Sequence, residues 1–108
     1  ARLELTRGGR QLTVHAGNPE VFLGRGGQND LVIRDPWVSR VHARVERRGG
    51  QFVLVDWSAN GTWVYPDGGK PISVKQGETV LAGNGFITLG RDGGPQSPDA
   101  VRYQVAEG

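Results

Sequence analysis

Short segments in which apolar and polar residues alternate run along almost the whole chain. Leu3 and Leu5 fall on one face of "RLELT", and Leu12 and Val14 repeat the pattern in "QLTVH". A period of two residues is typical of β-strands with one buried face. About eleven such segments follow one another, each bounded by Gly, Pro, Asn or Asp, and none has the period of about 3.6 residues of a capped helix. The sequence therefore predicts an all-β fold, an eleven-stranded, mostly antiparallel β-sandwich.

Turn-rich segments predict how these strands connect. "RGGR" predicts a hairpin over residues 2–15, and Gly49-Gly50 predicts one between "VHARVE" and "FVLVDW". "TVLA", "AGNG" and "FITLG" predict a further hairpin, and the Gly- and Pro-rich residues 91–100 predict a surface excursion. No repeat or internal boundary is visible. We therefore expect residues 1–108 to form a single domain, excised from a larger protein because the chain begins at Ala1 without Met.

Composition excludes several classes of site and of protein. The chain has no Cys, which excludes disulfides and thiolate metal ligands, and its longest apolar run, Phe52–Val55, is too short to span a membrane. No signal peptide opens the chain, so we expect a cytoplasmic and bacterial protein. The net charge is only +2, but residues 24–48 hold six arginines against three acidic residues. This local excess indicates either an anion site or a solvated strand face.

Ser39 and His42 raise the question of nucleophilic catalysis. In a strand, residues three positions apart point to opposite faces, which argues against a local Ser–His pair. His15, the only other His, stays open as a distant base. The chain also lacks a G-x-S-x-G segment and a set of metal-ligand residues. We therefore expect a protein that is not an enzyme and that needs no cofactor and no metal.

Three segments, "LGRGGQNDLVI", "VSRVHA" and "DWSANGTWV", resemble in order and spacing the forkhead-associated (FHA) domain, a phosphothreonine-binding module. The match runs over residues 23–64, and the family's eleven-stranded sandwich agrees with the strands expected along the rest of the chain. The resemblance implies that Arg25, Ser39 and Arg40 contact the phosphate and that Asn60 hydrogen-bonds the peptide main chain. A phosphothreonine carries about −1.5 to −2 charges and three acceptor oxygens, which suit the planar fork of a guanidinium group.

The resemblance also implies residues that support the site. His42 would tie the Ser39 loop to neighbouring backbone, and Trp63 would be an aromatic core residue. Trp37 and Trp57 flank the expected binding loops, where peptide contact and packing both stay open. Structural roles at turns and loops are implied for Gly24, Asn29, Asp35, Gly61 and Thr62.

Two departures from the family pattern keep other functions open. Ala59 stands where the family often has Thr, and "YPDGGKP" lengthens a turn that is usually Asn-Gly. They motivate a second hypothesis, an FHA-fold assembly module that works without phosphate through weak self-association. "VLAGNGFITLG" is similar to FHA domains attached to bacterial nucleotide cyclases.

A third hypothesis, a nucleic-acid-binding β domain, comes from the arginine-rich segment and the three Trp residues. Most of the aromatic residues fall at inward positions or in loops, which disfavours base stacking. We expect a threonine-phosphorylated protein or peptide as the partner in signal transduction or intramolecular regulation, with no nucleic acid and no membrane insertion.

Overall fold

Eleven β-strands make up the secondary structure of residues 1–107, the part of the chain that the computed structural model describes. Each strand is short and ends at a turn or loop, as the sequence predicts. Within residues 1–107 there is no helix that could cross a membrane, and no group of three His, Cys, Asp or Glu residues that could hold a metal ion. The strands are β1 (Arg2–Arg7), β2 (Arg10–Val14), β3 (Glu20–Gly24), β4 (Leu31–Val32), β5 (Ala43–Arg48), β6 (Gln51–Asp56), β7 (Thr62–Pro66), β8 (Ile72–Val74), β9 (Glu78–Leu81), β10 (Asn84–Leu89) and β11 (Val101–Ala106).

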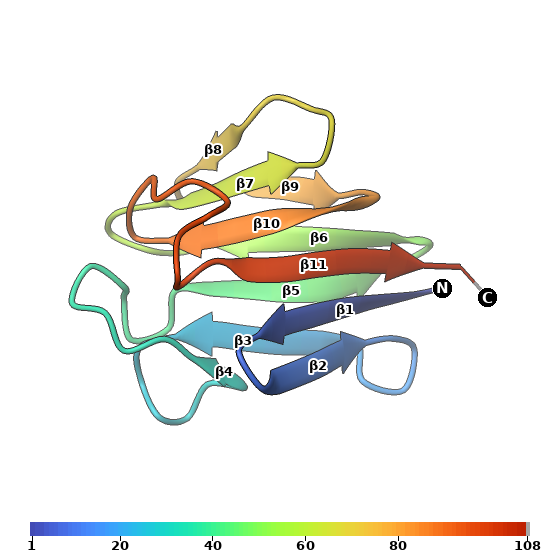
Figure 1. Cartoon of the computed structure of the whole chain (residues 1–108). Helices are drawn as coiled ribbons and strands as arrows, with labels where there is room; N and C mark the ends of the chain where they lie inside the picture. The colour runs from blue at the N-terminus through green and yellow to red at the C-terminus, as the bar shows by residue number, and fades with distance from the viewer. Residues whose placement is uncertain (108) are drawn as a thin grey trace.

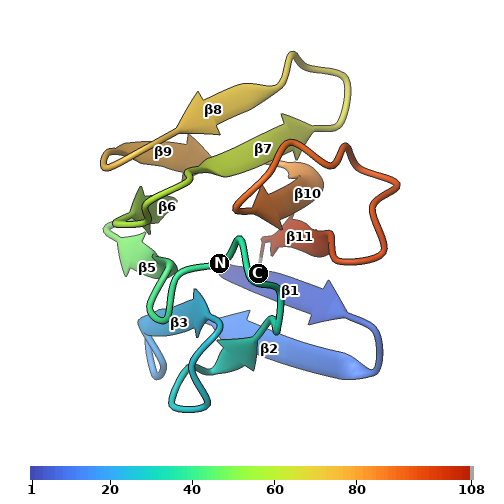
Figure 2. The same cartoon turned by 90° about the vertical axis from the view of Figure 1, so that its left-hand side faces the viewer.

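The strands form two sheets that pack face to face (Figure 2). One sheet has six strands in the order β2-β1-β11-β10-β7-β8, and the other has five in the order β4-β3-β5-β6-β9. Neighbouring strands are antiparallel, except that β3 and β4 run parallel. The predicted all-β sandwich of eleven strands is confirmed.

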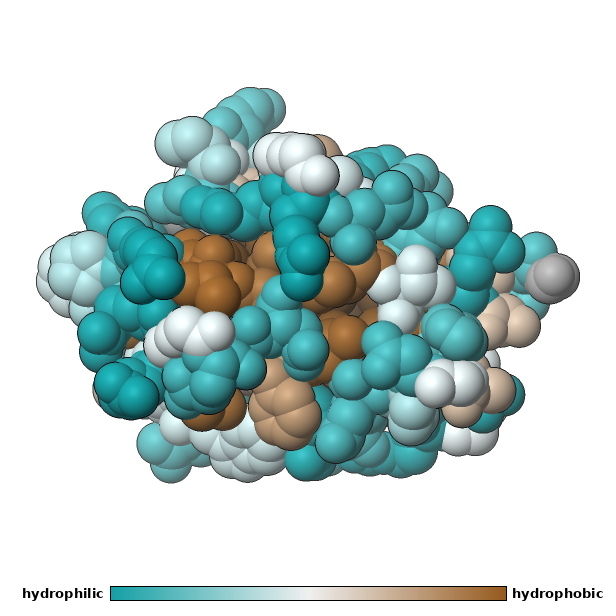
Figure 3. Space-filling model, turned by 90° about the horizontal axis from the view of Figure 1, so that it is seen from below, coloured by the Kyte–Doolittle hydropathy of each residue, from teal (hydrophilic) through white to brown (hydrophobic). Residues whose placement is uncertain are grey.

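The hydrophobic core lies between the two sheets and is supplied by the inward face of each strand. Leu3 and Leu5 of β1 belong to the same buried cluster as Val45 of β5 and Leu54 of β6, which come from the other sheet. In the view from below (Figure 3), apolar surface gathers in the middle of the face and polar side chains rim it. Leu3, Leu5 and Val14, which the alternation placed on inward faces, are buried, and Leu12 packs against the core.

One predicted connection is wrong. β9 and β10 do not form a hairpin, because β9 pairs with β6 in the five-stranded sheet whereas β10 pairs with β7 and β11 in the six-stranded sheet. Gly83, in the link between them, has a φ of 65°, which permits a tight bend. The link thus crosses from one sheet to the other. Because such a crossing uses the same turn residues as a hairpin, the sequence could not distinguish the two.

The expected core position of Trp63 is also wrong. Val64, its neighbour on β7, points inward and is buried, so Trp63 points to the outer face of the six-stranded sheet, where it is half-buried. Tyr65 shares this outer face and is buried under residues 91–100. Its hydroxyl group donates to Asp92 and accepts the Gly94 N–H at 3.1 Å. The predicted surface excursion is therefore fastened to the sheet.

The two ends of the described chain lie side by side at one end of the sandwich (Figure 1). β1 and β11 are antiparallel neighbours, with Arg2 opposite Ala106. The β3–β4, β4–β5 and β6–β7 connections lie at the other end. These connections carry most of the residues in the three motif segments.

Candidate functional site

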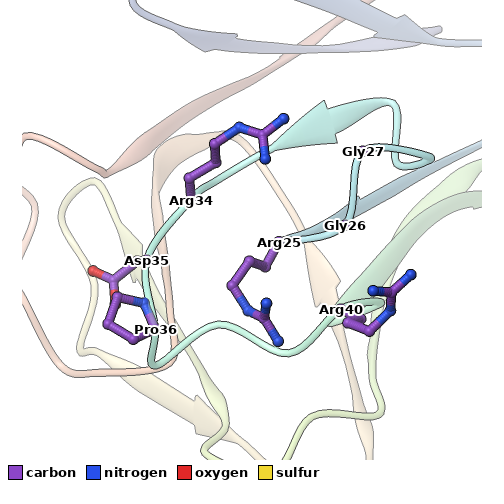
Figure 4. Close-up of a pocket in the computed structure, with 7 residues that line it drawn as sticks. All are labelled: Arg25, Gly26, Gly27, Arg34, Asp35, Pro36 and Arg40. Carbon is purple, nitrogen blue, oxygen red and sulfur yellow. The ribbon is translucent and has the colours of Figure 1, made fainter.

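A hollow at this loop end of the sandwich is lined mainly by arginine side chains and glycine backbone (Figure 4). Two connections meet there, the one between β3 and β4 and the one between β4 and β5. The hollow is lined by Arg25, Gly26, Gly27, Arg34, Asp35, Pro36 and Arg40.

Arg25 is held by two hydrogen bonds to the β4–β5 connection. Its backbone N–H donates to the Ser39 carbonyl at 2.9 Å, and its Nε donates to the Val38 carbonyl at 2.9 Å. Neither terminal nitrogen of the guanidinium group has a hydrogen-bond partner within residues 1–107. Figure 4 shows this side chain between those of Arg34 and Arg40. Arg25 therefore presents two donor groups to the hollow from a fixed base.

Asp35, the one acidic residue of the hollow, already has partners. Its carboxyl group accepts the Trp37 N–H at 2.9 Å and an Arg91 guanidinium nitrogen at 2.7 Å. The Trp37 N–H, and after it Arg91, hold the pKa of Asp35 below its usual value of 3.8, although desolvation opposes them.

The arginines of the hollow, by contrast, are unpaired. Within residues 1–107, no carboxyl oxygen lies within 4.0 Å of a guanidinium nitrogen of Arg25, Arg34 or Arg40. Because Asp35 is neutralised by Arg91 from outside the lining, the hollow carries uncompensated positive charge. Such a site favours an anion.

Ser39 and Asn60 lie on loops next to the hollow but are not among its lining residues. The Ser39 hydroxyl oxygen accepts the Ala59 N–H at 3.2 Å, so its own proton stays available to a ligand. Asn60 donates from Nδ2 to the Trp37 carbonyl at 2.9 Å and has no partner for Oδ1 within residues 1–107. These two bonds join the β6–β7 turn to the β4–β5 connection.

His42 is fully buried beneath these loops and makes two hydrogen bonds. Nδ1 accepts the Ser39 N–H at 3.0 Å. Nε2 lies 2.8 Å from the Gly61 carbonyl oxygen, and because a carbonyl oxygen only accepts, Nε2 carries the hydrogen and donates it. This pair of bonds requires the neutral imidazole. Burial lowers the pKa of His42 below 6.5, against the raising effects of Gly61 and Asp56. Nδ1 contacts the backbone of Ser39 and not its hydroxyl group, so the two do not form a nucleophile–base pair.

Gly24 and Asn29 hold the backbone of Arg40 in place. A Cβ atom at Gly24 would lie 2.3 Å from the Arg40 carbonyl oxygen, so only glycine allows this close approach. Asn29 donates from Nδ2 to the same carbonyl at 2.6 Å. The segment that carries Ser39 and Arg40 is therefore fixed from the β3 side.

Sequence reasoning missed the group that fixes the β6–β7 turn, the Asp56 carboxyl group. Asp56 is buried and accepts the backbone N–H groups of Ser58 and Gln76, both at 2.9 Å. The hydroxyl groups of Ser58, at 2.9 Å, and Thr62, at 2.6 Å, also donate to it. The Gly61 N–H donates in turn to the Ser58 hydroxyl at 2.7 Å. An Asp two residues before a Ser at the end of a strand is the local signal that indicates such a turn.

Comparison with known proteins agrees with this architecture. The family model described as "FHA domain" matches residues 21–90, more than half of the chain. The FHA domain-containing protein FhaB of Mycolicibacterium smegmatis is 36% identical over 77 residues, which cover 68% of this chain and 48% of that protein. The chain thus spans about half the length of this relative.

Two solved structures share the fold. The FHA-1 domain of Mycobacterium tuberculosis Rv1747 matches with a TM-score of 0.75 and 22% identity, covering 98% of this chain and 97% of that one. Mycobacterium tuberculosis EmbR, in complex with a low-affinity phosphopeptide, matches with a TM-score of 0.74 and 22% identity, covering 100% of this chain and 25% of that one. The family model, the relative and the sandwich all lead to one assignment, and the chain belongs to the FHA-domain family.

Proposed function

We propose that this domain is a phosphothreonine-dependent binding module with no catalytic activity of its own. The observation that carries the proposal is the hollow in which Arg25 and Arg40 lie without a carboxyl partner among residues 1–107, beside the hydroxyl group of Ser39. A phosphate group supplies the charge and the acceptor oxygens that these groups lack. The EmbR complex, a structure of the same fold that holds a phosphopeptide, supports the proposal.

Each expected site residue has a defined role in this proposal. Arg25, Ser39 and Arg40 donate to the phosphate, and Asn60 hydrogen-bonds the peptide main chain next to the phosphothreonine. Asn60 is suited to this because one amide hydrogen and its Oδ1 remain available after the bond to Trp37. The site is supported by Gly24, His42, Gly61 and Thr62.

The energies require the peptide as well as the phosphate. Three charge-assisted hydrogen bonds contribute about 1.5–3 kcal/mol each before the ligand is ordered. Their gross sum, about 4.5–9 kcal/mol, only just reaches the roughly 8.2 kcal/mol of a micromolar complex. We therefore infer that the domain binds a phosphorylated protein segment and not free phosphate, with Asn60 contributing to the difference.

The test is a calorimetric titration with a degenerate phosphothreonine peptide library, beside its phosphoserine and unphosphorylated versions. Binding should be confined to phosphothreonine and lost in Arg25→Ala, because that variant removes the central donor of the hollow. Arg47→Ala is the matched control. Arg47 is exposed on β5 and, within the described chain, pairs with no carboxyl group, so its loss removes the same charge away from the hollow.

Three results would contradict the proposal. Equal binding of phosphorylated and unphosphorylated peptides would show that binding does not depend on the phosphate. Binding unchanged by Arg25→Ala would show that the phosphate is not held at the assigned site. If the folded domain bound no phosphopeptide but associated with itself equally with and without Arg25, the phosphate-independent assembly module would replace the proposal. Ala59, whose N–H is already bonded to Ser39, is the feature that favours this alternative.

A further inference from the structure

Arg91 lies outside the lining of the hollow but binds Asp35, the acidic residue within it. A guanidinium nitrogen of Arg91 lies 2.7 Å from a carboxyl oxygen of Asp35. The proposed function gives this pair no role, because neither side chain is a donor to the phosphate or to the peptide. The position of the pair at the edge of the hollow nevertheless bears on the charge inside it.

The Asp35 carboxyl group borders the hollow but is turned away from the arginines in it. Its side chain is only 13% exposed, and Figure 4 shows the carboxyl group pointing away from Arg25 and Arg34. Besides Arg91, its one hydrogen-bond partner within residues 1–107 is the Trp37 N–H, at 2.9 Å. An Asp side chain has three staggered positions about χ1, so a carboxyl group released from Arg91 is able to turn toward the hollow.

The backbone beneath both side chains is fixed without the ion pair. The Asp35 N–H donates to the Ile33 carbonyl at 3.0 Å, and the Asp35 carbonyl accepts the Val38 N–H at 2.9 Å. The Arg91 carbonyl accepts the Thr88 hydroxyl group at 2.9 Å. Loss of the Arg91 side chain would therefore change the direction of the Asp35 carboxyl group and leave the loops in place.

The Arg91 side chain is itself held in position. Its guanidinium group lies 5.8 Å from the centre of the Trp37 ring. Gly90, directly before it, donates its N–H to the Gly61 carbonyl at 2.9 Å. A Cβ atom at Gly90 would lie 2.4 Å from the Trp37 carbonyl oxygen, so this segment packs closely against the connection that carries Asp35.

A carboxyl group turned into the hollow would find guanidinium groups there that lack a partner. Arg25, Arg34 and Arg40 line the hollow, and no carboxyl oxygen of residues 1–107 lies within 4.0 Å of their guanidinium nitrogens. Opposite charges attract more strongly in a partly covered site than on an open surface, because water and salt screen them less. Asp35 is thus placed to compete with an anionic ligand.

We propose that Arg91 is a positioning residue that keeps the arginines of the hollow unpaired, by holding the Asp35 carboxyl group away from them. Without Arg91, this carboxyl group would take the place of an anionic ligand. The consequence for phosphothreonine peptides rests on the proposed function, in which Arg25 and Arg40 donate to the phosphate. Arg91 then sets the affinity of the site without touching the ligand.

The experiment compares wild type with Arg91→Met, Asp35→Asn and the double variant. Met keeps a long apolar side chain and removes the donors, and Asn keeps an oxygen that accepts the Trp37 N–H and removes the charge. Arg102→Met is the matched control. Arg102 pairs at 3.2 Å with Asp67, which lies in the β7–β8 connection, so this variant also frees a carboxyl group and makes the same change in net charge, but outside the lining of the hollow.

We expect Arg91→Met to weaken binding of a phosphothreonine peptide about tenfold, because the released carboxyl group competes for a charge-assisted contact. Asp35→Asn and the double variant should bind at least as tightly as wild type, since neither has that carboxyl group. Arg102→Met should change the affinity less than about twofold. Recovery in the double variant separates this role from simple support of the loop, which a second substitution would not restore.

A second measurement needs no ligand. The Arg25 Nε–H is bonded to the Val38 carbonyl at 2.9 Å, which protects its NMR resonance from exchange with water. We expect this resonance to shift in Arg91→Met, when the Asp35 carboxyl group reaches the hollow, and to return in the double variant.

Binding by the double variant as weak as that of Arg91→Met would overturn the inference and leave the proposed function standing. Unchanged affinity in Arg91→Met would do the same. If wild type bound no phosphothreonine peptide, the proposed function would be overturned, and the spectra without ligand would decide the inference alone. An Arg25 resonance at the same position in wild type and in Arg91→Met would then overturn it.

Discussion

Replacing Thr62 by Val tests whether the buried Asp56 carboxyl group holds the binding turn. Val has almost the same shape as Thr, so the change removes the hydrogen bond of 2.6 Å to Asp56 and leaves no cavity. A hydrogen bond to a charged group contributes about 1.5–3 kcal/mol. Because the same carboxyl oxygen keeps the Ser58 hydroxyl at 2.9 Å, we take the lower half of this range, about 1.5–2 kcal/mol.

The magnitude translates into measurable shifts. With an unfolding entropy of about 2.1 cal/mol/K per residue, a loss of about 1.5 kcal/mol lowers the Tm of a chain of this length by about 7 °C. Urea unfolding followed by tryptophan fluorescence should show the same loss as a lower midpoint with an unchanged slope.

Thr6→Val is the matched control. The Thr6 hydroxyl group makes no hydrogen bond to another side chain within residues 1–107, and β1 tolerates Val as well as Thr. We expect its free energy of unfolding to change by less than about 0.5 kcal/mol. If Thr62→Val behaved like this control, the hydrogen bonds of Asp56 would not be what stabilises the turn, and the reasoning would be refuted.

Two further predictions concern the residues under the loops. The pKa of His42 is below 6.5 in the folded domain, so the unfolded chain takes up a proton first as the pH falls. The contribution of His42 to the free energy of unfolding should therefore be fully present above pH 6.5 and decline below it, until the lower pKa of the folded state is reached. The decline should be at most about 1.4 kcal/mol per pH unit. Urea midpoints measured from about pH 8 to 5 check this, and a wild-type profile as flat as that of His42→Gln would contradict it. Gly24→Ala should weaken both folding and phosphopeptide binding, because its Cβ would meet the Arg40 carbonyl oxygen at 2.3 Å, whereas Gly50→Ala, with nothing within 4 Å, should leave both unchanged in thermal unfolding and peptide titration.

The strands were predictable because alternation is a local property. Val64 and its neighbours alternate between inward and outward positions, and the same rule places Trp63 outward, where the family resemblance had placed it in the core. The partners of a strand are not a local property. A Gly-rich link serves equally for a hairpin and for a crossing between sheets, so residues 82–83 did not reveal that β9 and β10 belong to different sheets.

The arrangement of the candidate site was predictable for the residues of the motif segments, but not for residues that come from far along the chain. Arg25 and Arg40 are brought into one hollow, and His42 links the Ser39 backbone to the Gly61 carbonyl. Arg91 binds Asp35 from 56 residues away, and its guanidinium group lies 5.8 Å from the centre of the Trp37 ring. No local sequence pattern predicts the contacts of Arg91 with Asp35 and Trp37, because they form only when residues 91–100 fold over the sheet.

The pairing of β1 with β11 determines how the domain responds to mechanical force. Arg2 lies opposite Ala106, so pulling the two ends apart acts across this pair of strands and not along it. The hydrogen bonds between them are then loaded one after another, beginning at the end where the force is applied, as in a zipper. The connections that carry Arg25 and Arg40 lie at the opposite end of the sandwich (Figure 1), so a load applied at the two ends reaches them only after β1 and β11 have begun to separate.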